Sequence, residues 1–419
     1  MRAVDRVIDN ASEIVTCAGF SNGPARGGDQ ARLGIVRDGA IAIAKGRFVD
    51  VGPRDRVLRE NVAPKNGVID AKRGVVLPGF VDPHTHLIFA GDRASEWEQR
   101  MQGKPYLEIL REGGGILRTV TATRAALHDE LLENAKRWAA IAIAHGTTTI
   151  EIKSGYCLDR EGELKLLSVA RALGESIPIA TVRTFLGAHV VPSEHKNDRE
   201  AYLTLVEETQ AEAARQGLAE IADVFCEAEA FTLAETERLL THAKAHGLAV
   251  KVHAEQFTAS GATALAARLG AVSVDHLEHL EADDLRALGA MERPPVAVLL
   301  PGVSFHLGMD RHANARALID ASVPVALATD MNPGSSCTPS MPMIVQLACR
   351  ALRMTVAEAI VASTINAAHA IRRGAETGSI EVGKRADVIV CDIPDHRWLG
   401  YAFGINPVAR VIANGVIVR

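Results

Sequence analysis

Two hydrophobic periods divide the chain of 419 residues. Residues 33–53 alternate apolar and polar positions around a Lys-Gly turn signal, a pattern typical of antiparallel strands. Segments 385–393 and 408–419 alternate in the same way, and the second contains an Asn-Gly turn signal. Neither end holds enough strands to bury a core by itself. The pattern therefore predicts that both chain ends pair into one small β-sandwich domain.

Between the two ends, short apolar runs alternate with amphipathic helical stretches such as 160–174 and 232–247. Eight runs read as strands, at 79–86, 146–155, 179–189, 221–227, 249–256, 271–279, 295–302 and 324–330. Eight short strands alternating with helices predict an α/β fold, a closed parallel (β/α)8 TIM barrel. The same periodicity leaves a doubly wound open sheet as the alternative. The predicted division is an N-terminal β-sandwich segment at 1–76, the barrel at 77–372 and a C-terminal β-sandwich segment at 373–419.

Composition narrows the class of protein. The formal net charge is −5 and 47% of the residues are hydrophobic, which is typical of a cytoplasmic enzyme and argues against nucleic acid as a partner. Acidic residues interrupt the first fifteen positions, and no run of eighteen apolar residues follows, so we expect neither a secretory leader nor a membrane span. The six cysteines form no C-x-x-C pair, which disfavours a disulfide framework or a thiolate zinc site.

Polar residues stand where the barrel strands are predicted to end, and such ends converge on one mouth of a barrel. His84 and His86 have the two-residue spacing that points both imidazoles to the same side of an extended segment. His253 and Asp330 end two other strands, and together the four residues make a ligand set suited to one zinc or ferrous iron ion. An H-x-H pair alone is equally compatible with chance. A packing core has no use for four such groups, which favours the metal site.

Four motifs carry a resemblance, in the order PGFVDPHTH (78–86), VHAEQ (252–256), DHLEH (275–279) and LATDMNPGSS (327–336). With the barrel and its attached β domain, they resemble the amidohydrolase superfamily of metal-dependent hydrolases. Longer blocks, such as 86–124, resemble one branch of it, the ring-opening hydrolases of histidine degradation. The resemblance implies hydrolysis of 4-imidazolone-5-propionate to N-formimidoyl-L-glutamate, in which metal-activated water attacks the ring carbonyl. Relatives with two metals use a strand-four lysine, which 221–227 lacks, so we expect one ion.

Arg93 follows the H-x-H motif by seven residues. The resemblance places it at the substrate, where a guanidinium can pair with the propionate carboxylate. The alternative from the sequence alone is a structural ion pair with Asp92 or Glu96.

The resemblance implies further substrate contacts from Tyr156, His189, Gln256, Asn332, Gly334 and Ser335. Without it, Tyr156 reads equally well as a half-buried strand-end tyrosine, and 332–335 as ordinary turn chemistry. His189 ends its strand, which favours a functional role. Segment 113–115 reads as a flexible stretch over the mouth.

His276 and Asp330 are the predicted catalytic pair, with His276 transferring protons because imidazole titrates near neutral pH. A role for His276 as a further metal ligand is the competing interpretation. Some relatives carry a glutamate three residues after the strand-five histidine, where this chain has Gln256, which cannot abstract a proton. Glu255 stands one position earlier, and alternation predicts that it points away from the mouth.

Two other functions stay open. A purine or pyrimidine deaminase would share the barrel, the histidines and the aspartate, but a neutral base offers Arg93 no carboxylate. A non-catalytic barrel should have lost ligand positions, and all of them are filled here. Because superfamily relatives often pair, we also expect a homodimer.

Overall fold

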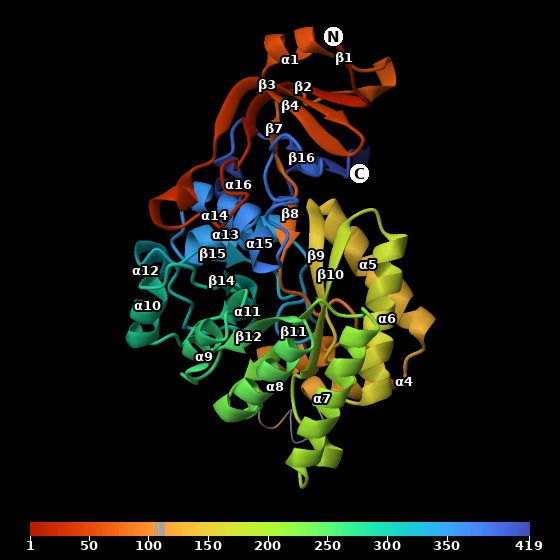
Figure 1. Ribbon diagram of the computed structural model, residues 1–419, viewed down its shortest axis with the longest axis vertical. Coiled ribbons are helices and arrows are strands. Elements are labelled where there is room, and N and C mark those ends of the chain that lie inside the picture. Colours follow the sequence, from red (N-terminus) through yellow and green to blue (C-terminus); the bar gives the residue numbers. More distant parts are fainter. Residues whose placement is uncertain (105–107, 109–113) are drawn as a thin grey trace.

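The computed structural model describes residues 1–104, 108 and 114–419. A barrel of strands with helices outside it forms most of the molecule (Figure 1). A sheet built from both chain ends stands beyond one end of the barrel, and both termini lie there. Among the described residues, no helix has the length and apolar character needed to cross a lipid bilayer.

The barrel strands are hydrogen-bonded in sequence order, and every neighbouring pair is parallel. They are β8 (Phe80–Asp82), β9 (Thr147–Lys153), β10 (Ala180–Ala188), β11 (Ile221–Cys226), β12 (Ala249–Ala254), β13 (Ser273–His276), β14 (Val296–Leu299) and β15 (Val325–Leu327). The ring closes beyond β8 and β15, where the Asp330 N–H donates to the His84 carbonyl at 3.0 Å and the His86 N–H to the Met331 carbonyl at 2.9 Å. The predicted barrel is confirmed, and the sequential order rules out a doubly wound sheet.

Side chains cap the start of several helices. Thr232 and Glu235 form a capping box at the start of α8 (Leu233–Ala245), and the Asp159 side chain accepts from the Gly162 N–H at the start of α6 (Arg160–Ser176). The helices that follow the barrel strands are α2 (Ala94–Met101), α4 (Ile116–Ala125), α5 (His128–Ala144), α6 (Arg160–Ser176), α7 (Arg199–Arg215), α8 (Leu233–Ala245), α9 (Ala262–Arg268), α10 (Ala282–Gly289), α11 (Pro301–Leu307), α12 (Ala315–Asp320), α13 (Met341–Ala351), α14 (Val356–Ala362) and α15 (Ile365–Ala370). Their apolar faces cover the outside of the barrel.

The end sheet, as we call the sheet from the two chain ends, has eight strands. They are β2 (Arg6–Val15), β3 (Ile35–Ala44), β4 (Arg47–Pro53), β6 (Val68–Asp70), β7 (Val75–Pro78), β16 (Val388–Cys391), β17 (Val408–Ala413) and β18 (Val416–Ile417). β16 pairs with β7 and so joins the C-terminal strands to the N-terminal ones. Smaller elements flank the sheet: β1 (Arg2–Ala3), β5 (Asn61–Val62), α1 (Arg54–Glu60) and α16 (Trp398–Tyr401).

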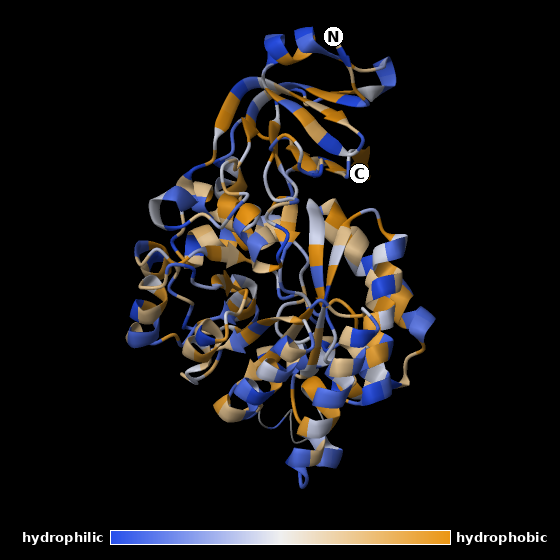
Figure 2. Cartoon of the chain, viewed as in Figure 1, coloured by the Kyte–Doolittle hydropathy of each residue, from blue (hydrophilic) through white to orange (hydrophobic). Residues whose placement is uncertain are grey.

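Alternating residues of the end sheet enter two separate apolar clusters. Ile41 and Ile43 belong to one, and Ala40 and Ala42 to the other. Figure 2 shows hydrophobic residues interspersed with hydrophilic ones along these strands. Sequence analysis missed β2, which pairs with β3 and β7. A register shift between Ile8 and Ala11 breaks its alternation, which hides the strand from a period-two pattern.

The proposed division at 76/77 and 372/373 is crossed by hydrogen bonds. The Asn366 side chain of α15 pairs with the Ala25 backbone, and the Gln30 side chain bonds both backbone groups of Val325 in β15. Some of the N-terminal segment is therefore packed on the barrel, and the division into three segments stays a prediction.

Candidate metal and substrate site

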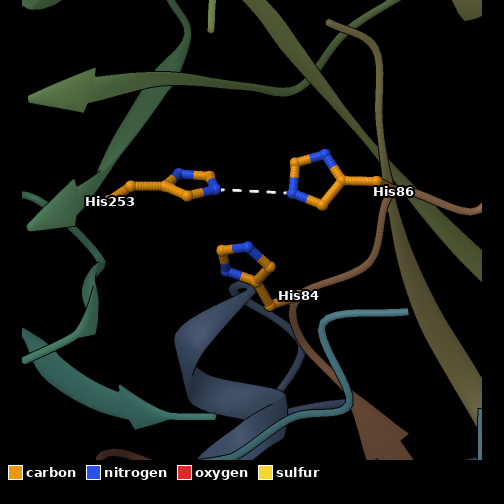
Figure 3. A group of neighbouring side chains, drawn as sticks. All are labelled: His84, His86 and His253. Carbon is orange, nitrogen blue, oxygen red and sulfur yellow. Dashed lines mark hydrogen bonds between the residues drawn. The ribbon is translucent and has the colours of Figure 1, made fainter. Parts of the chain in front are cut away.

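The predicted ligands meet at one end of the barrel. His84 and His86 follow β8, His253 lies in β12, and Asp330 follows β15. The Nε2 atoms of His86 and His253 are 3.4 Å apart, and Asp330 Oδ1 lies 3.4 Å from Nε2 of both His84 and His86. Figure 3 shows the three imidazoles turned toward a common centre. Three nitrogens and one oxygen thus converge from strands that are far apart in sequence.

Two buried carboxylates fix the orientation of these rings. His84 Nδ1 lies 2.5 Å from Asp275 Oδ2, and His253 Nδ1 lies 3.0 Å from Asp223 Oδ2. A carboxylate beside Nδ1 retains the hydrogen on that nitrogen, which leaves Nε2 free as a metal donor.

Burial keeps the imidazoles neutral. It lowers the pKa of His84 and His86 well below the usual value, with Lys153 adding to the effect at His84 and His189 at His86. Burial also lowers the pKa of His253, to about 4. Neutral imidazole is the form that binds a metal.

The donor set fits a divalent ion. His84 Nε2 and Asp330 Oδ1 are buried without a hydrogen-bond partner, which is costly unless something else satisfies them. Burial raises the pKa of Asp330 to about 7, so its carboxylate gains from a cation. His84, His86 and His253 have ligand atoms within 4.8 Å of one another, as do His84, His276 and Asp330. The second group leaves both interpretations of His276 open.

Backbone strain accompanies the site. His276 and Leu277 have φ values of 86° and 70°, and Asp330 has φ of 49°, all in the left-handed region that side chains disfavour. These residues turn the chain where their strands end, and the alternation that a strand would impose stops there. Such strain is common where a structure must aim functional groups.

A layer of buried charges underlies the histidines, and sequence analysis missed it. Lys153 Nζ lies 2.9 Å from Glu151 and 2.7 Å from Asp223, while Lys251 Nζ lies 2.8 Å from Asp275 and 3.3 Å from Glu151. All five side chains are inaccessible to solvent. The signal in the sequence was charge at two-residue spacing, Glu151 with Lys153 and Lys251 with His253, on otherwise apolar strands.

Arg93 reaches the same end of the barrel. Its Nε donates to Glu96 Oε2 at 3.0 Å, so the ion pair considered from the sequence is present. The guanidinium also lies against Gly334, where an added Cβ would stand 2.0 Å from Arg93 Nη1. The ion pair orients the arginine toward the loop that follows Asp330, and it is compatible with a substrate role.

Asn332, Gly334 and Ser335 form that loop. Asn332 Oδ1 accepts from the backbone N–H groups of Gly334 and Ser335 at 2.8 Å each, and Asn332 Nδ2 donates to Ser335 Oγ at 2.8 Å. The Asn332 side chain therefore shapes the turn, as the simpler interpretation of this segment expected.

Tyr156 and His189 are buried beside the predicted metal ligands. The His189 ring stacks on His86 with centroids 5.0 Å apart, and Tyr156 lies 5.7 Å from His86 and 5.5 Å from His189. His189 Nδ1 donates to the Gly155 carbonyl at 3.0 Å. Burial lowers the pKa of His189 to about 4, which leaves the ring neutral. Both residues thus stand where a ligand of the metal centre would contact them.

Gln256 is buried just past β12, and its neighbour Glu255 points elsewhere. Glu255 accepts from the Thr263 hydroxyl and from Ser260 Oγ, so it faces α9, as alternation predicted.

Gly113, in the segment expected to cover the mouth, lies outside the described residues. Gly115 precedes α4, and its N–H donates to Glu96.

Comparison with known proteins agrees with this barrel. A model of the amidohydrolase family matches residues 75–418. The chain belongs to this family. An imidazolonepropionase of Symbiobacterium thermophilum is 48% identical over 100% of the chain and 98% of its own length. Another, of Geobacillus thermodenitrificans, is 46% identical over 98% of the chain and 97% of its own length.

Solved structures show the same fold at lower identity. An adenosine deaminase from Xanthomonas campestris with bound zinc superposes with a TM-score of 0.72 and 20% identity, covering 99% of the chain and 93% of its own. The guanine deaminase of E. coli has a TM-score of 0.71 and 15% identity, covering 99% and 98%. At these identities the likeness concerns the fold.

Proposed function

We propose that the chain is an imidazolonepropionase, a metal-dependent hydrolase that opens 4-imidazolone-5-propionate to N-formimidoyl-L-glutamate. The observation that carries the proposal is the convergence of His84, His86, His253 and Asp330 in a chain whose full-length relatives, at 46% and 48% identity, are imidazolonepropionases. The reaction breaks a cyclic amide C–N bond.

One divalent ion, zinc or iron, would be held by the three Nε2 atoms and the Asp330 carboxylate. When bound, such an ion supplies Lewis-acid activation that brings the pKa of water from ~15.7 toward roughly 7. Three imidazoles and a carboxylate suit either metal, so cellular supply selects between them.

The chain's own groups bind the substrate and move protons. Arg93 pairs with the propionate carboxylate, for which its forked guanidinium is suited. Tyr156 donates its hydroxyl hydrogen to the bound ring or its tail, and the Gln256 amide orients the amidine end.

His276 and Asp330 transfer protons between the attacking water and the departing ring nitrogen. Their closeness supports this assignment, since one atom of each lies within 4.8 Å of the other and of a His84 nitrogen. The loop of Asn332, Gly334 and Ser335 lies beside Arg93 and completes the proposed substrate contacts, with the Asn332 side chain holding the loop in shape.

The test is to incubate the purified protein with 4-imidazolone-5-propionate, follow the loss of the ring chromophore, and measure metal in the same sample. We expect turnover with about one zinc or iron per chain. Ammonia release from guanine or cytosine, without turnover of the imidazolone, would favour the deaminase instead. On the precedent of the superfamily we also propose a cytoplasmic homodimer, which sedimentation and cell fractionation would test.

A further inference from the structure

The loop between β9 and α6 is wrapped around one buried carboxylate, that of Glu163. Glu163 Oε1 accepts from the Cys157 N–H at 2.9 Å and the Leu158 N–H at 2.8 Å, and Oε2 accepts from the Gly155 N–H at 2.8 Å. The side chain is 1% exposed. Three backbone N–H groups thus donate to its two oxygens, so the side chain serves this loop as a hydrogen-bond acceptor.

The conformation that Glu163 holds is strained. Leu158 has φ of 57° and Gly155 has φ of 107°. A Cβ at Gly155 would stand 3.1 Å from His189 Nδ1 and 2.9 Å from the Leu186 carbonyl oxygen. Left-handed backbone at the non-glycine residue Leu158 needs compensation from its surroundings, and the buried carboxylate supplies it through three backbone hydrogen bonds to the loop.

This loop connects directly to two groups at the mouth. Tyr156 lies between the amides that Glu163 binds. The Gly155 carbonyl accepts from His189 Nδ1 at 3.0 Å. A carbonyl oxygen cannot donate, so this contact requires the hydrogen on Nδ1 and leaves Nε2 as the nitrogen available to a ligand.

We propose that Glu163 is a positioning residue for substrate binding. It holds the Gly155 carbonyl and Tyr156 in place, and through that carbonyl it sets the orientation of His189. Glu163 itself contacts neither the substrate nor the metal ligands. The expected change in KM rests on the proposed function. The hydrogen bonds of Glu163 are observed independently of it.

The test compares Glu163→Gln with Glu358→Gln. The glutamine at 163 has nearly the same shape but presents an NH2 group to a backbone N–H. Glu358 is a matched control, because it lies in the first turn of α14, on the side of the barrel near the end sheet. Its buried carboxylate accepts from the Thr355 N–H and from Arg316 of α12. Both variants lose a buried acceptor, but only one lies near the mouth.

For Glu163→Gln we expect KM for 4-imidazolone-5-propionate to rise about tenfold or more, with kcat changed less than about threefold and bound metal unchanged. Amide hydrogen exchange should quicken in peptides covering 155–158 and 186–189. Glu358→Gln should leave KM and both peptides as they are in the unchanged chain, even where its melting temperature falls.

Faster exchange at 155–158 with unaltered KM would reduce Glu163 to a structural role and overturn the proposal, as would an equal rise in KM for both variants. If Glu163→Gln does not fold, Gly155→Ala is the second variant, because its added Cβ disturbs the contact between Gly155 and His189. An unaltered KM for Gly155→Ala also overturns the proposal. Failure of the unchanged chain to hydrolyse the imidazolone refutes the proposed function instead. The exchange comparison and the affinity for the unreactive analogue imidazole-4-propionate then decide the role of Glu163.

Discussion

The inside of the barrel and the inside of the end sheet are built on opposite principles. In the end sheet, neighbouring strands present Ile8, Ile41 and Ile43 to one buried cluster, which is wholly apolar. In the barrel below the histidines, inward positions carry Lys153, Lys251 and their carboxylate partners, with no solvent access. Both regions are closely packed β structure.

The two interiors therefore contribute differently to the free energy of folding. An apolar cluster gains free energy simply from leaving water, about 25 cal/mol per Å2. Buried ion pairs gain little or nothing net, because desolvation offsets their attraction. The ionic layer therefore contributes less to the fold than an aliphatic layer of equal volume would, and its arrangement instead orients His84 and His253.

The largest expected effect is at the proposed metal ligands. His84→Ala removes a nitrogen donor and leaves Asp275 without its imidazole, so we expect metal content near zero and turnover lower by at least ~10³-fold. Metal analysis and a chromophore assay measure both. Ile41→Val, in the end sheet, is the control and should retain full metal. Retention of metal by His84→Ala would contradict the ligand assignment.

The next largest effect is in the ionic layer. Lys251→Met leaves Asp275 and Glu151 buried without a cation, so the free energy of unfolding should fall by about 3–5 kcal/mol. Metal affinity should fall as well, because Asp275 loses the ammonium group that holds it beside His84. Chemical denaturation and competition with a chelator measure the two losses.

Lys384→Met is the matched control for that prediction. Lys384 is also buried, but it donates to the Gly374 carbonyl and to Ser379 Oγ, away from the histidines. The Lys384→Met variant should change the free energy of unfolding without changing metal affinity. An equal loss of metal affinity in Lys251→Met and Lys384→Met would mean that the ionic layer does not specifically support the metal site.

His276→Asn sharpens the comparison within the site. If His276 transfers protons, the variant retains its metal while kcat falls by roughly 10²–10⁴-fold. Metal content and kcat, measured on one preparation, separate the two interpretations. Loss of metal would make His276 a ligand.

Arg93→Ala should act on binding. Loss of the charge-assisted pair with the propionate should raise KM by about tenfold to a hundredfold, with a smaller change in kcat. A neutral imidazolone without the propionate should be affected far less. An equal rise in KM for both compounds would mean that Arg93 acts only through its structural ion pair with Glu96.

The smallest expected effect is in the end sheet. Ile41→Val removes one methylene group from an apolar cluster and should cost about 0.5–1.5 kcal/mol of unfolding free energy. KM and kcat should stay as they are, because the cluster does not contact the mouth. A change in KM would show that the two regions are coupled.

Much of the architecture could be predicted because its signals are local. The eight barrel strands were identified from short apolar runs, and His84 and His86 share a side because of their spacing. β2 was missed where a bulge interrupts its alternation. Alternation does not give the side-chain directions at strand ends, because the backbone at His276 and Asp330 is left-handed.

The sequence by itself determined the class of fold, the family and the identity of the groups that can bind a metal, since periodicity and residue chemistry are properties of short segments. Only the tertiary structure decided that Asp223 and Asp275 stand behind two of the histidines, that Lys153 and Lys251 hold those carboxylates, and that Glu163 supports the loop at Gly155. These contacts join residues that are distant along the chain or that meet across a strained turn. Closure of the barrel brings most of them together.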